Sequence, residues 1–215
     1  MQGFGSDPAL NASGDVAFLA NTTTGISIFR KAPGGAFTTI ADKSGPFTTI
    51  SSPSINAGGT VAFRGFTATD QGIYSGNGGT VATVATTAGP YSGFLFAPQI
   101  NDSGTIAFEA QLDDGRTGIF TGPDPLANAV IVTGSPLFGG TVTLVQFYRG
   151  LDNLGNIAFS YEISMPGGGT VDGIAVASVP EPASLGLLVC GAGLCLWRRR
   201  TRQTARCGAE SSTLR

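Results

Sequence analysis

Four carboxylates are the side chains of this chain best suited to chemistry. They are Glu109, Asp113, Asp114 and Glu162. Glycosidases cleave sugar chains with two such groups, one as an acid and the other as a base or nucleophile. However, Glu109 follows the core residue Phe108 on a predicted strand and should point outward. Asp113 and Asp114 lie in a loop beside Arg116, where solvated charges are common. We therefore expect no catalytic residues, and a carbohydrate-active, glycosidase-like enzyme is the alternative.

Histidine and cysteine are missing from most of the chain. There is no histidine, and the three cysteines, Cys190, Cys195 and Cys207, lie near the C-terminus. This excludes Ser-His-Asp and Cys-His catalysis and the usual zinc and copper sites from residues 1–178. The turn at residues 101–104 could offer oxygens to Ca²⁺, but no acidic residue recurs at matched positions in its copies. We expect no metal and no cofactor.

Charge is unevenly distributed along the chain. Of 12 Lys and Arg, six are arginines after residue 197, so residues 1–178 hold six basic and 12 acidic side chains. Binding to phosphate backbones needs clustered Lys or Arg. We therefore expect no nucleic acid partner.

A motif recurs four times along the chain. Its copies are "SDPALNASGDVAF" (6–18), "SSPSINAGGTVAF" (51–63), "FAPQINDSGTIAF" (96–108) and "YRGLDNLGNIAF" (148–159). The closing phenylalanines, Phe18, Phe63, Phe108 and Phe159, lie 45, 45 and 51 residues apart. Such regular spacing indicates a repeated structural unit.

Each copy has the residues of a tight turn. The first turn position is Asn11, Asn56, Asn101 or Asp152, whose side-chain oxygen can accept the N–H two residues on. Three residues later the glycines Gly14, Gly59, Gly104 and Gly155 suit a backbone with positive φ. We expect turn residues here and assign them no ligand.

The pattern predicts an all-β fold over residues 1–178. Runs of β-forming residues give about four strands per ~45 residues, the size of one blade of a β-propeller. The fourth unit has two such runs before the tail, so we expect three and a half blades of an incomplete, N-terminally truncated propeller. We also expect upstream DNA to encode more repeats and a signal peptide, because residues 1–10 have neither a basic nor an apolar segment.

The C-terminal segment has the composition of a membrane anchor. Residues 183–197 are uncharged and mostly apolar, and Arg198, Arg199 and Arg200 follow directly. As a helix this run spans ~22 Å of a ~30 Å hydrocarbon core, and the arginines favour a cytoplasmic end. A buried core helix is the alternative, but no polar face interrupts the run.

The tail resembles the PEP-CTERM sorting signal of Gram-negative bacteria. The resemblance covers residues 179–202: Val179, Pro180, Glu181 and Pro182, then the predicted transmembrane helix 183–197, then the arginines. Residues 203–215 extend past the family's usual end and form a predicted cytoplasmic polar tail. The resemblance implies an exosortase-type membrane processing enzyme as a partner. It also implies transient insertion in the inner membrane before display at the cell surface or release.

The repeats resemble the "NxxGxxAF" tandem repeats of choice-of-anchor exported proteins. Asn, Gly, Ala and Phe of the pattern match in the first three copies, whereas Asp152 departs from it in the fourth. This resemblance implies architecture and export, and no activity. We therefore expect an exported, non-catalytic repeat protein of the extracellular matrix or biofilm that interacts with exopolysaccharide or with protein partners.

Overall fold

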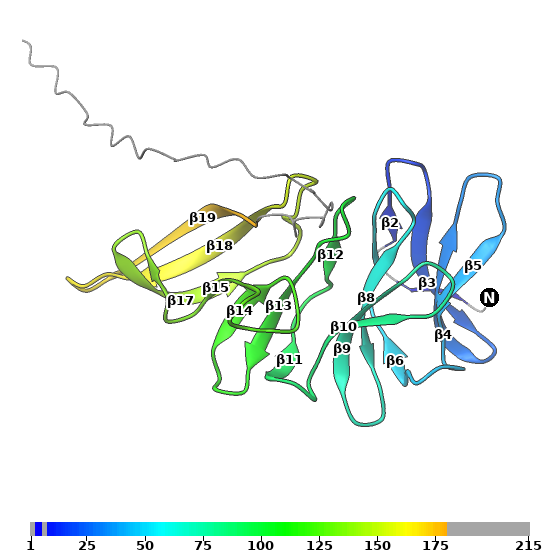
Figure 1. The fold of residues 1–215 in the computed structure, drawn as a ribbon, viewed down its shortest axis with the longest axis horizontal. Coiled ribbons are helices and arrows are strands. Elements are labelled where there is room, and N and C mark those ends of the chain that lie inside the picture. The colour runs from blue at the N-terminus through cyan, green and yellow to red at the C-terminus, as the bar shows by residue number, and fades with distance from the viewer. Residues whose placement is uncertain (1–2, 6–7, 180–215) are drawn as a thin grey trace, which may run out of the picture. The chain divides into compact units, whose positions relative to one another are not determined.

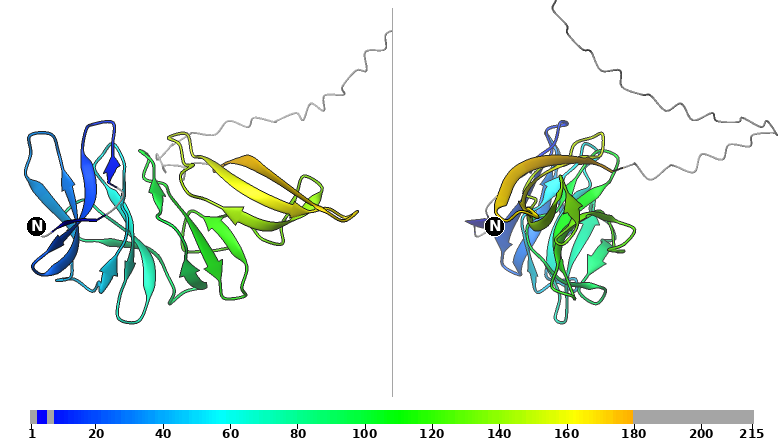
Figure 2. Two further views of the ribbon diagram at one scale, coloured as in Figure 1. Left: turned by 180° about the vertical axis from the view of Figure 1, so that it is seen from behind. Right: turned by 90° about the vertical axis from the view of Figure 1, so that its left-hand side faces the viewer.

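The structure, a computed structural model, describes residues 3–5 and 8–179. These residues form only strands and no helix, which confirms the expected all-β class. The strands make four antiparallel sheets that follow one another in chain order (Figure 1, Figure 2). The predicted transmembrane helix 183–197 lies outside the described residues. Within the described ranges no helix is long and apolar enough to cross a membrane.

The first two sheets share one plan. In the first, the order is β1 (Gly3–Phe4), β3 (Val16–Thr22), β4 (Gly25–Lys31) and β5 (Phe37–Ala41), with the short β2 (Ala9–Leu10) beside the start of β3. In the second, the order is β6 (Thr49–Ile50), β8 (Val61–Phe66), β9 (Gln71–Gly76) and β10 (Ala82–Thr86), with β7 (Ser54–Ile55) beside β8.

The third sheet has the same plan as the first two, and the fourth differs from them at its edges. The third has β11 (Tyr91–Phe94), β13 (Ile106–Leu112), β14 (Thr117–Phe120) and β15 (Ala129–Val132), with β12 (Gln99–Ile100) beside β13. The fourth has β16 (Pro136–Leu137), β17 (Gly140–Gln146), β18 (Asn156–Ser164) and β19 (Thr170–Ser178). Strand β19 pairs as β14 does and forms the edge of its sheet, because no strand of the described region lies beyond it.

The expected count of three and a half units is wrong. The run that precedes each turn belongs to the sheet of the following motif: β6 and β7 both pair with β8. Counted this way, the described residues hold four sheets with four strands each in the main path. The sequence pattern gave the wrong boundary between units. It follows the regular spacing of the turn and does not show which sheet the strands before the turn belong to.

The motif glycines have the backbone conformation that the turn requires. Their φ angles are 83°, 78°, 89° and 77° at Gly14, Gly59, Gly104 and Gly155. The expected side-chain bond is wrong in detail for the asparagines, because each Oδ1 accepts the N–H four residues on. The donors are the backbones of Asp15, Thr60 and Thr105, at 2.8, 2.9 and 2.8 Å. Asp152 Oδ1 accepts two N–H groups: that of Leu154, two residues on, and that of Asn156, four residues on.

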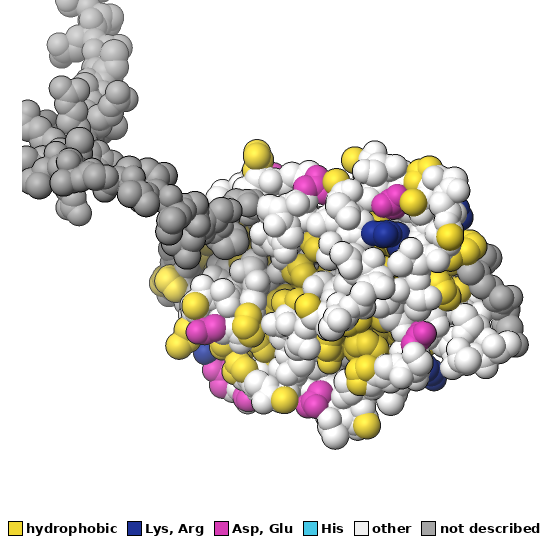
Figure 3. Space-filling view, turned by 45° about the vertical axis from the view of Figure 1, so that its right-hand side comes forward, with side chains coloured by type: hydrophobic (Ala, Val, Ile, Leu, Met, Phe, Trp, Pro, Cys, Tyr) yellow, Lys and Arg dark blue, Asp and Glu magenta, His cyan; other side chains and the backbone are white. Residues whose placement is uncertain are grey.

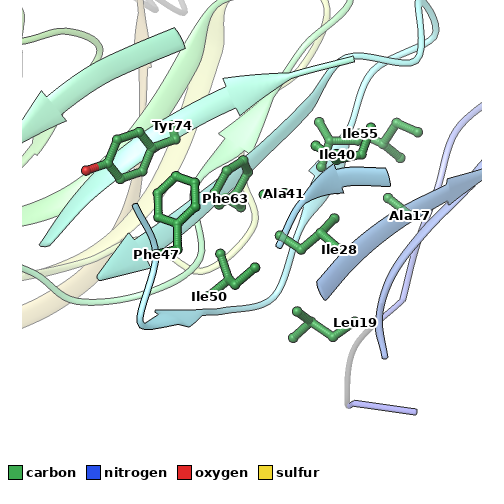
Figure 4. Packing of buried hydrophobic residues seen from close by; sticks show 11 residues of the cluster. Ala17, Leu19, Ile28, Ile40, Ala41, Phe47, Ile50, Ile55, Phe63 and Tyr74 are labelled. Atoms are coloured by element: carbon green, nitrogen blue, oxygen red, sulfur yellow. The ribbon is translucent and has the colours of Figure 1, made fainter. Parts of the chain in front are cut away.

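Alternation along the long strands gives each sheet two apolar faces. Ala17, Leu19 and Ile28 of the first sheet lie in one buried cluster with Phe63 and Tyr74 of the second (Figure 4). The other face of the second sheet packs on the third, and the other face of the third packs on the fourth. Burial of one such side chain is worth about 1.5–3 kcal/mol, so contact between successive sheets is the main stabilising interaction.

Candidate ligand-binding groove

A groove lies where the four repeats meet. Its volume is about 760 Å³. The stretches that line it are the ones that precede the four turns: residues 8–10, 51–55, 95–100 and 148–149. Every repeat therefore contributes to one concave surface. Ligand-binding sites commonly have this shape.

Prolines explain why the first three of these stretches leave one side open to the groove. Strands β2, β7 and β12 begin directly after Pro8, Pro53 and Pro98. Proline has no N–H to donate to a neighbouring strand, so it interrupts the pairing of the strand that leads to it. After the proline the chain pairs only briefly before the turn, which leaves one side of the stretch open to the groove.

The two charged side chains that line the groove are both arginines, Arg64 and Arg149. Arg64 follows the motif residue Phe63 and is half-buried. Its Nη1 donates to the carbonyl oxygens of Phe94 and Leu95, at 2.6 and 2.5 Å. Its Nε has no hydrogen-bond partner in the part of the chain that the structure describes. Burial lowers the pKa of the Arg64 guanidinium but leaves it charged.

A second unsatisfied group and an aromatic pair complete the wall of the groove. The Oγ of Ser54, which is buried, also has no hydrogen-bond partner within residues 3–5 and 8–179. The rings of Phe96 and Tyr148 lie 4.5 Å apart between centroids, and Tyr148 is 55% exposed. Hydrophobic side chains are visible in the hollows of the face shown in Figure 3.

This combination suits a sugar polymer. The C–H face of a pyranose ring is weakly polar and can pack on an aromatic ring, while its hydroxyls need donors and acceptors at the edge. Tyr148 and Phe96 offer the rings, and Gln99 and the two arginines offer polar groups. No acid is among the described residues that line the groove, so its two arginines offer positive charge to a carboxylate.

Three of the four candidate catalytic acids are held by different partners. Glu109 accepts a bond from the backbone of Phe147, Asp114 pairs with Arg116 at 2.7 Å, and Glu162 accepts the Thr143 hydroxyl at 2.7 Å. Asp113 lies four residues beyond Glu109, about 13 Å along an extended chain. No two of these carboxylates share a hydrogen-bond partner, and none lines the groove.

The expectation that Glu109 points outward is wrong. Its side chain is 3% exposed, and its Oε2 accepts the Phe147 N–H at 2.7 Å. Both faces of the third sheet are covered: Phe108 faces the second sheet, so Glu109 faces the fourth. Burial raises the pKa of Glu109 to about 7, and the Phe147 N–H opposes this rise. Glu109 lines a second, smaller cavity of about 400 Å³ with Thr117 and Gln146, and Leu95 and Phe96 line both this cavity and the groove.

The turn residues link the repeats to one another. The Nδ2 of Asn11 donates to the carbonyl oxygen of Asn56 at 2.8 Å, and that of Asn56 to Asn101 at 3.1 Å. Asn101 donates in the same way to Asp152, at 3.1 Å. The sequence predicted the local turn, but it did not predict this chain of contacts between turns.

Most of the predicted sorting signal lies outside the described residues. Pro180, Glu181, Pro182, Arg198, Arg199 and Arg200 are in this group. Val179 is described: its N–H donates to the Gly155 carbonyl oxygen at 2.9 Å, which fixes the end of the last sheet to the last turn.

The sequence alone does not single out Arg64, Ser54, Phe96 and Gln99 as groove residues. A usable signal was the repeat itself. Arg64 and Glu109 hold the same position, directly after the motif phenylalanine, and that position faces the next repeat. Ser54 and Gln99 both follow the motif proline.

Comparison with known proteins gives a family without an assigned activity. No curated protein matches the chain. Residues 31–189 match DUF7453, described as a family of unknown function. The match includes the second, third and fourth motifs and the groove residues from Ser51 to Arg149. Because it covers more than half of the sequence, the chain belongs to this family of unknown function, DUF7453.

Proposed function

We propose that this protein is an exported, non-catalytic repeat protein that binds an acidic extracellular polysaccharide in the groove. The observation that carries the proposal is the lining of the groove, in which the exposed Tyr148 and the partly buried Phe96 lie beside two arginines and, among the described residues, no acid. Residues 1–178 hold twice as many acidic as basic side chains. Two cations without an acid at one concave surface therefore depart from the charge of the rest of that region.

Glu109, Asp114 and Glu162 have different partners and do not line the groove, which supports a non-catalytic role. Hydrolysis of a glycosidic bond needs two carboxyl groups about 5–10 Å apart, on either side of the scissile bond. Glu109 is enclosed between two sheets, and Asp114 is held by Arg116 at an exposed hairpin. The glycosidase alternative gains no support from this placement.

Export and sorting are part of the same proposal. Their support is the order of Pro180-Glu181-Pro182, the apolar run 183–197 and the arginine block. In this proposal the four sheets act as blades of a propeller-like domain that is carried to the cell surface. Replacement of Glu181 and Pro182 by alanine should leave the protein in the inner membrane fraction. Normal release of that variant would contradict the sorting proposal.

A binding experiment tests the groove. Affinity of the full chain would be measured by calorimetry for a soluble polyuronate and for a neutral glucan of similar length. Tyr148→Ala and Arg149→Gln should each weaken polyuronate binding by about tenfold, the loss expected for one important contact. Because the Arg149 contribution is electrostatic, added salt should weaken binding by the parent more than by Arg149→Gln.

Matched control variants lie away from the groove. Arg116→Gln removes a cation of the same kind from an exposed hairpin, and Leu126→Ala removes an exposed apolar side chain from the loop after β14. Both should keep the parent affinity. Equal losses in the groove and control variants, or no binding of either polymer by the parent, would overturn the proposed function.

A further inference from the structure

The cavity around Glu109 meets the groove at residues 95–96, because Leu95 and Phe96 line both spaces. The carbonyl oxygen of Leu95 accepts a hydrogen bond from Nη1 of Arg64, a groove residue, at 2.5 Å. The N–H of Leu95 donates to the carbonyl oxygen of Glu109, a cavity residue, at 3.1 Å. One residue of the chain thus contacts both the arginine of the groove and the acid of the cavity. An extended ligand that crosses Phe96 would therefore enter both spaces.

The Glu109 carboxyl has one oxygen without a partner. Oε2 accepts the Phe147 N–H, whereas no residue of the described ranges donates to Oε1. The fully enclosed side-chain atoms that lack a partner in those ranges belong to Ser54 and Arg64, so Oε1 is accessible from the cavity that Glu109 lines. A buried carboxylate with too few donors is unfavourable, which agrees with the raised pKa that burial gives Glu109. A ligand hydroxyl that donates to Oε1 would reduce this cost.

The rest of the cavity lining offers polar groups and apolar contacts, but no Lys or Arg among the described residues. The Gln146 side chain has no hydrogen-bond partner in the described region, so its amide can both donate and accept. The Thr143 hydroxyl donates to Oε1 of Glu162 at 2.7 Å, which brings a second carboxylate close to the lining. The cavity therefore suits an uncharged ligand with hydroxyl groups and disfavours a carboxylate.

We propose that the groove and the cavity together hold two neighbouring sugar residues of different charge: an acidic residue beside the arginines and a neutral residue whose hydroxyls donate to Glu109. The ligand is then a heteropolysaccharide in which uronate and neutral residues lie side by side. This inference rests on the proposed function, which places an acidic polysaccharide in the groove, and it adds the composition of that polymer. The cavity volume of about 400 Å³ lies within the range of about 300–1,000 Å³ that small-ligand sites have.

Three forms of one polymer test the inference by calorimetry with the full chain at pH 8, where Glu109 is mostly ionised. They are a polygalacturonate, the same polymer with half of its carboxyl groups reduced to neutral galactose, and the fully reduced polymer. Length and linkage are the same in all three, so only the charge differs. The parent should bind the half-reduced form about tenfold more tightly than the fully acidic form, because a uronate in the cavity would be repelled by Glu109.

Glu109→Gln removes the negative charge of the cavity but keeps an oxygen that can accept a hydroxyl. This variant should bind the fully acidic form about tenfold more tightly than the parent does, so that the preference for the half-reduced form disappears. A gain of affinity cannot come from partial unfolding. The control is Asp113→Asn, which removes a carboxylate from an exposed position outside both spaces and should keep the parent preference.

Gln146→Ala tests the cavity without changing its charge. It should weaken binding of the half-reduced form by about fivefold, the usual effect of one lost hydrogen bond, and leave the affinity for the fully acidic form unchanged. Equal losses for the two forms would contradict a neutral sugar at Gln146.

The outcomes separate this inference from the proposed function. If the parent binds the fully acidic form at least as tightly as the half-reduced form, or if Glu109→Gln keeps the parent preference, the inference is wrong and the groove proposal stands. If neither carboxylated form binds, the proposed function itself fails. Tightest binding of the fully reduced polymer would overturn both, because the arginines would then contribute nothing.

Discussion

The side-chain amide of Asn56 donates a hydrogen bond to the backbone carbonyl oxygen of Asn101, 3.1 Å away and 45 residues further along the chain. The oxygen of the same amide accepts the N–H of Thr60 and closes the local turn. One buried side chain thus forms its own hairpin and connects it to the next. The spacing of the motif is therefore also the spacing of a hydrogen-bonded contact between repeats.

Replacement of Asn56 by aspartate should destabilise the protein by about 1–3 kcal/mol, the usual cost of leaving a buried polar group without its partner. The variant keeps the oxygen that accepts from Thr60 but loses the donor to Asn101, and it brings a negative charge to a carbonyl oxygen. Urea unfolding followed by circular dichroism measures the loss. Asn77→Asp, the same change at an exposed hairpin, is the control and should leave the midpoint unchanged. Equal midpoints for both variants would show that the contact between turns contributes no stability.

Gly104→Ala and Gly59→Ala separate two roles of the turn glycines. Both positions have positive φ, so each substitution should cost about 1–2 kcal/mol through backbone strain alone. A β-carbon at Gly104 would meet no atom within 4 Å, whereas one at Gly59 would overlap Nη1 of Arg30. That nitrogen donates to the Gly59 carbonyl oxygen at 2.8 Å. We expect a larger loss of unfolding free energy at Gly59, and equal losses would show that Arg30 moves aside without cost.

Tyr91→Phe and Tyr74→Phe form a second matched pair. The buried Tyr91 hydroxyl donates to the Gly122 carbonyl oxygen at 2.8 Å, and its ring packs on Phe108 and Phe120. The Tyr74 hydroxyl has no hydrogen-bond partner among the described residues. Tyr91→Phe should therefore lower the unfolding free energy by about 1 kcal/mol, and Tyr74→Phe should leave it unchanged. A loss of unfolding free energy of similar size in both variants would show that the hydrogen bond to Gly122 is not its cause.

Local features of the fold could be predicted from the sequence, because they depend on a few adjacent residues. The all-β class and the glycines with positive φ follow from turn chemistry and from the alternation of side chains along a strand. The pairing of β7 with β8 follows from the same turn, because a tight turn brings the strands on its two sides together. The pairing of β6 with β8 could not be predicted, since residues 51–53 separate β6 from β7 and no residue type specifies that partner.

The groove could be predicted only in part. Tyr148 and Arg149 are adjacent in the sequence, so their closeness follows from the chain itself. Arg64 and Phe96 reach the groove from different repeats, and only the packing of one sheet on the next brings them together. Glu109 was misplaced because a strand with one solvated face was assumed, whereas the third sheet is covered on both sides.

The buried carboxyl of Glu109 should make stability depend on pH. Its pKa in the folded protein is raised to about 7, while an unfolded chain has the ordinary value near 4.5. At low pH both states hold the proton, so Glu109 has no effect. As pH rises from about 4.5 to 7, the unfolded state releases the proton first, and unfolding becomes more favourable. Above pH 7 the penalty is constant.

Glu109→Gln tests this by removing the titration while keeping an oxygen that can accept the Phe147 N–H. Urea midpoints measured from pH 4 to pH 8 should fall for the parent relative to the variant, mainly between pH 4.5 and 7, with the variant the more stable protein at pH 8. Glu162→Gln, at a less buried carboxyl that accepts from Thr143, should follow the parent through this range. Parallel curves for Glu109→Gln and the parent would mean that Glu109 is ionised in the folded protein, with the Phe147 N–H outweighing the cost of burial.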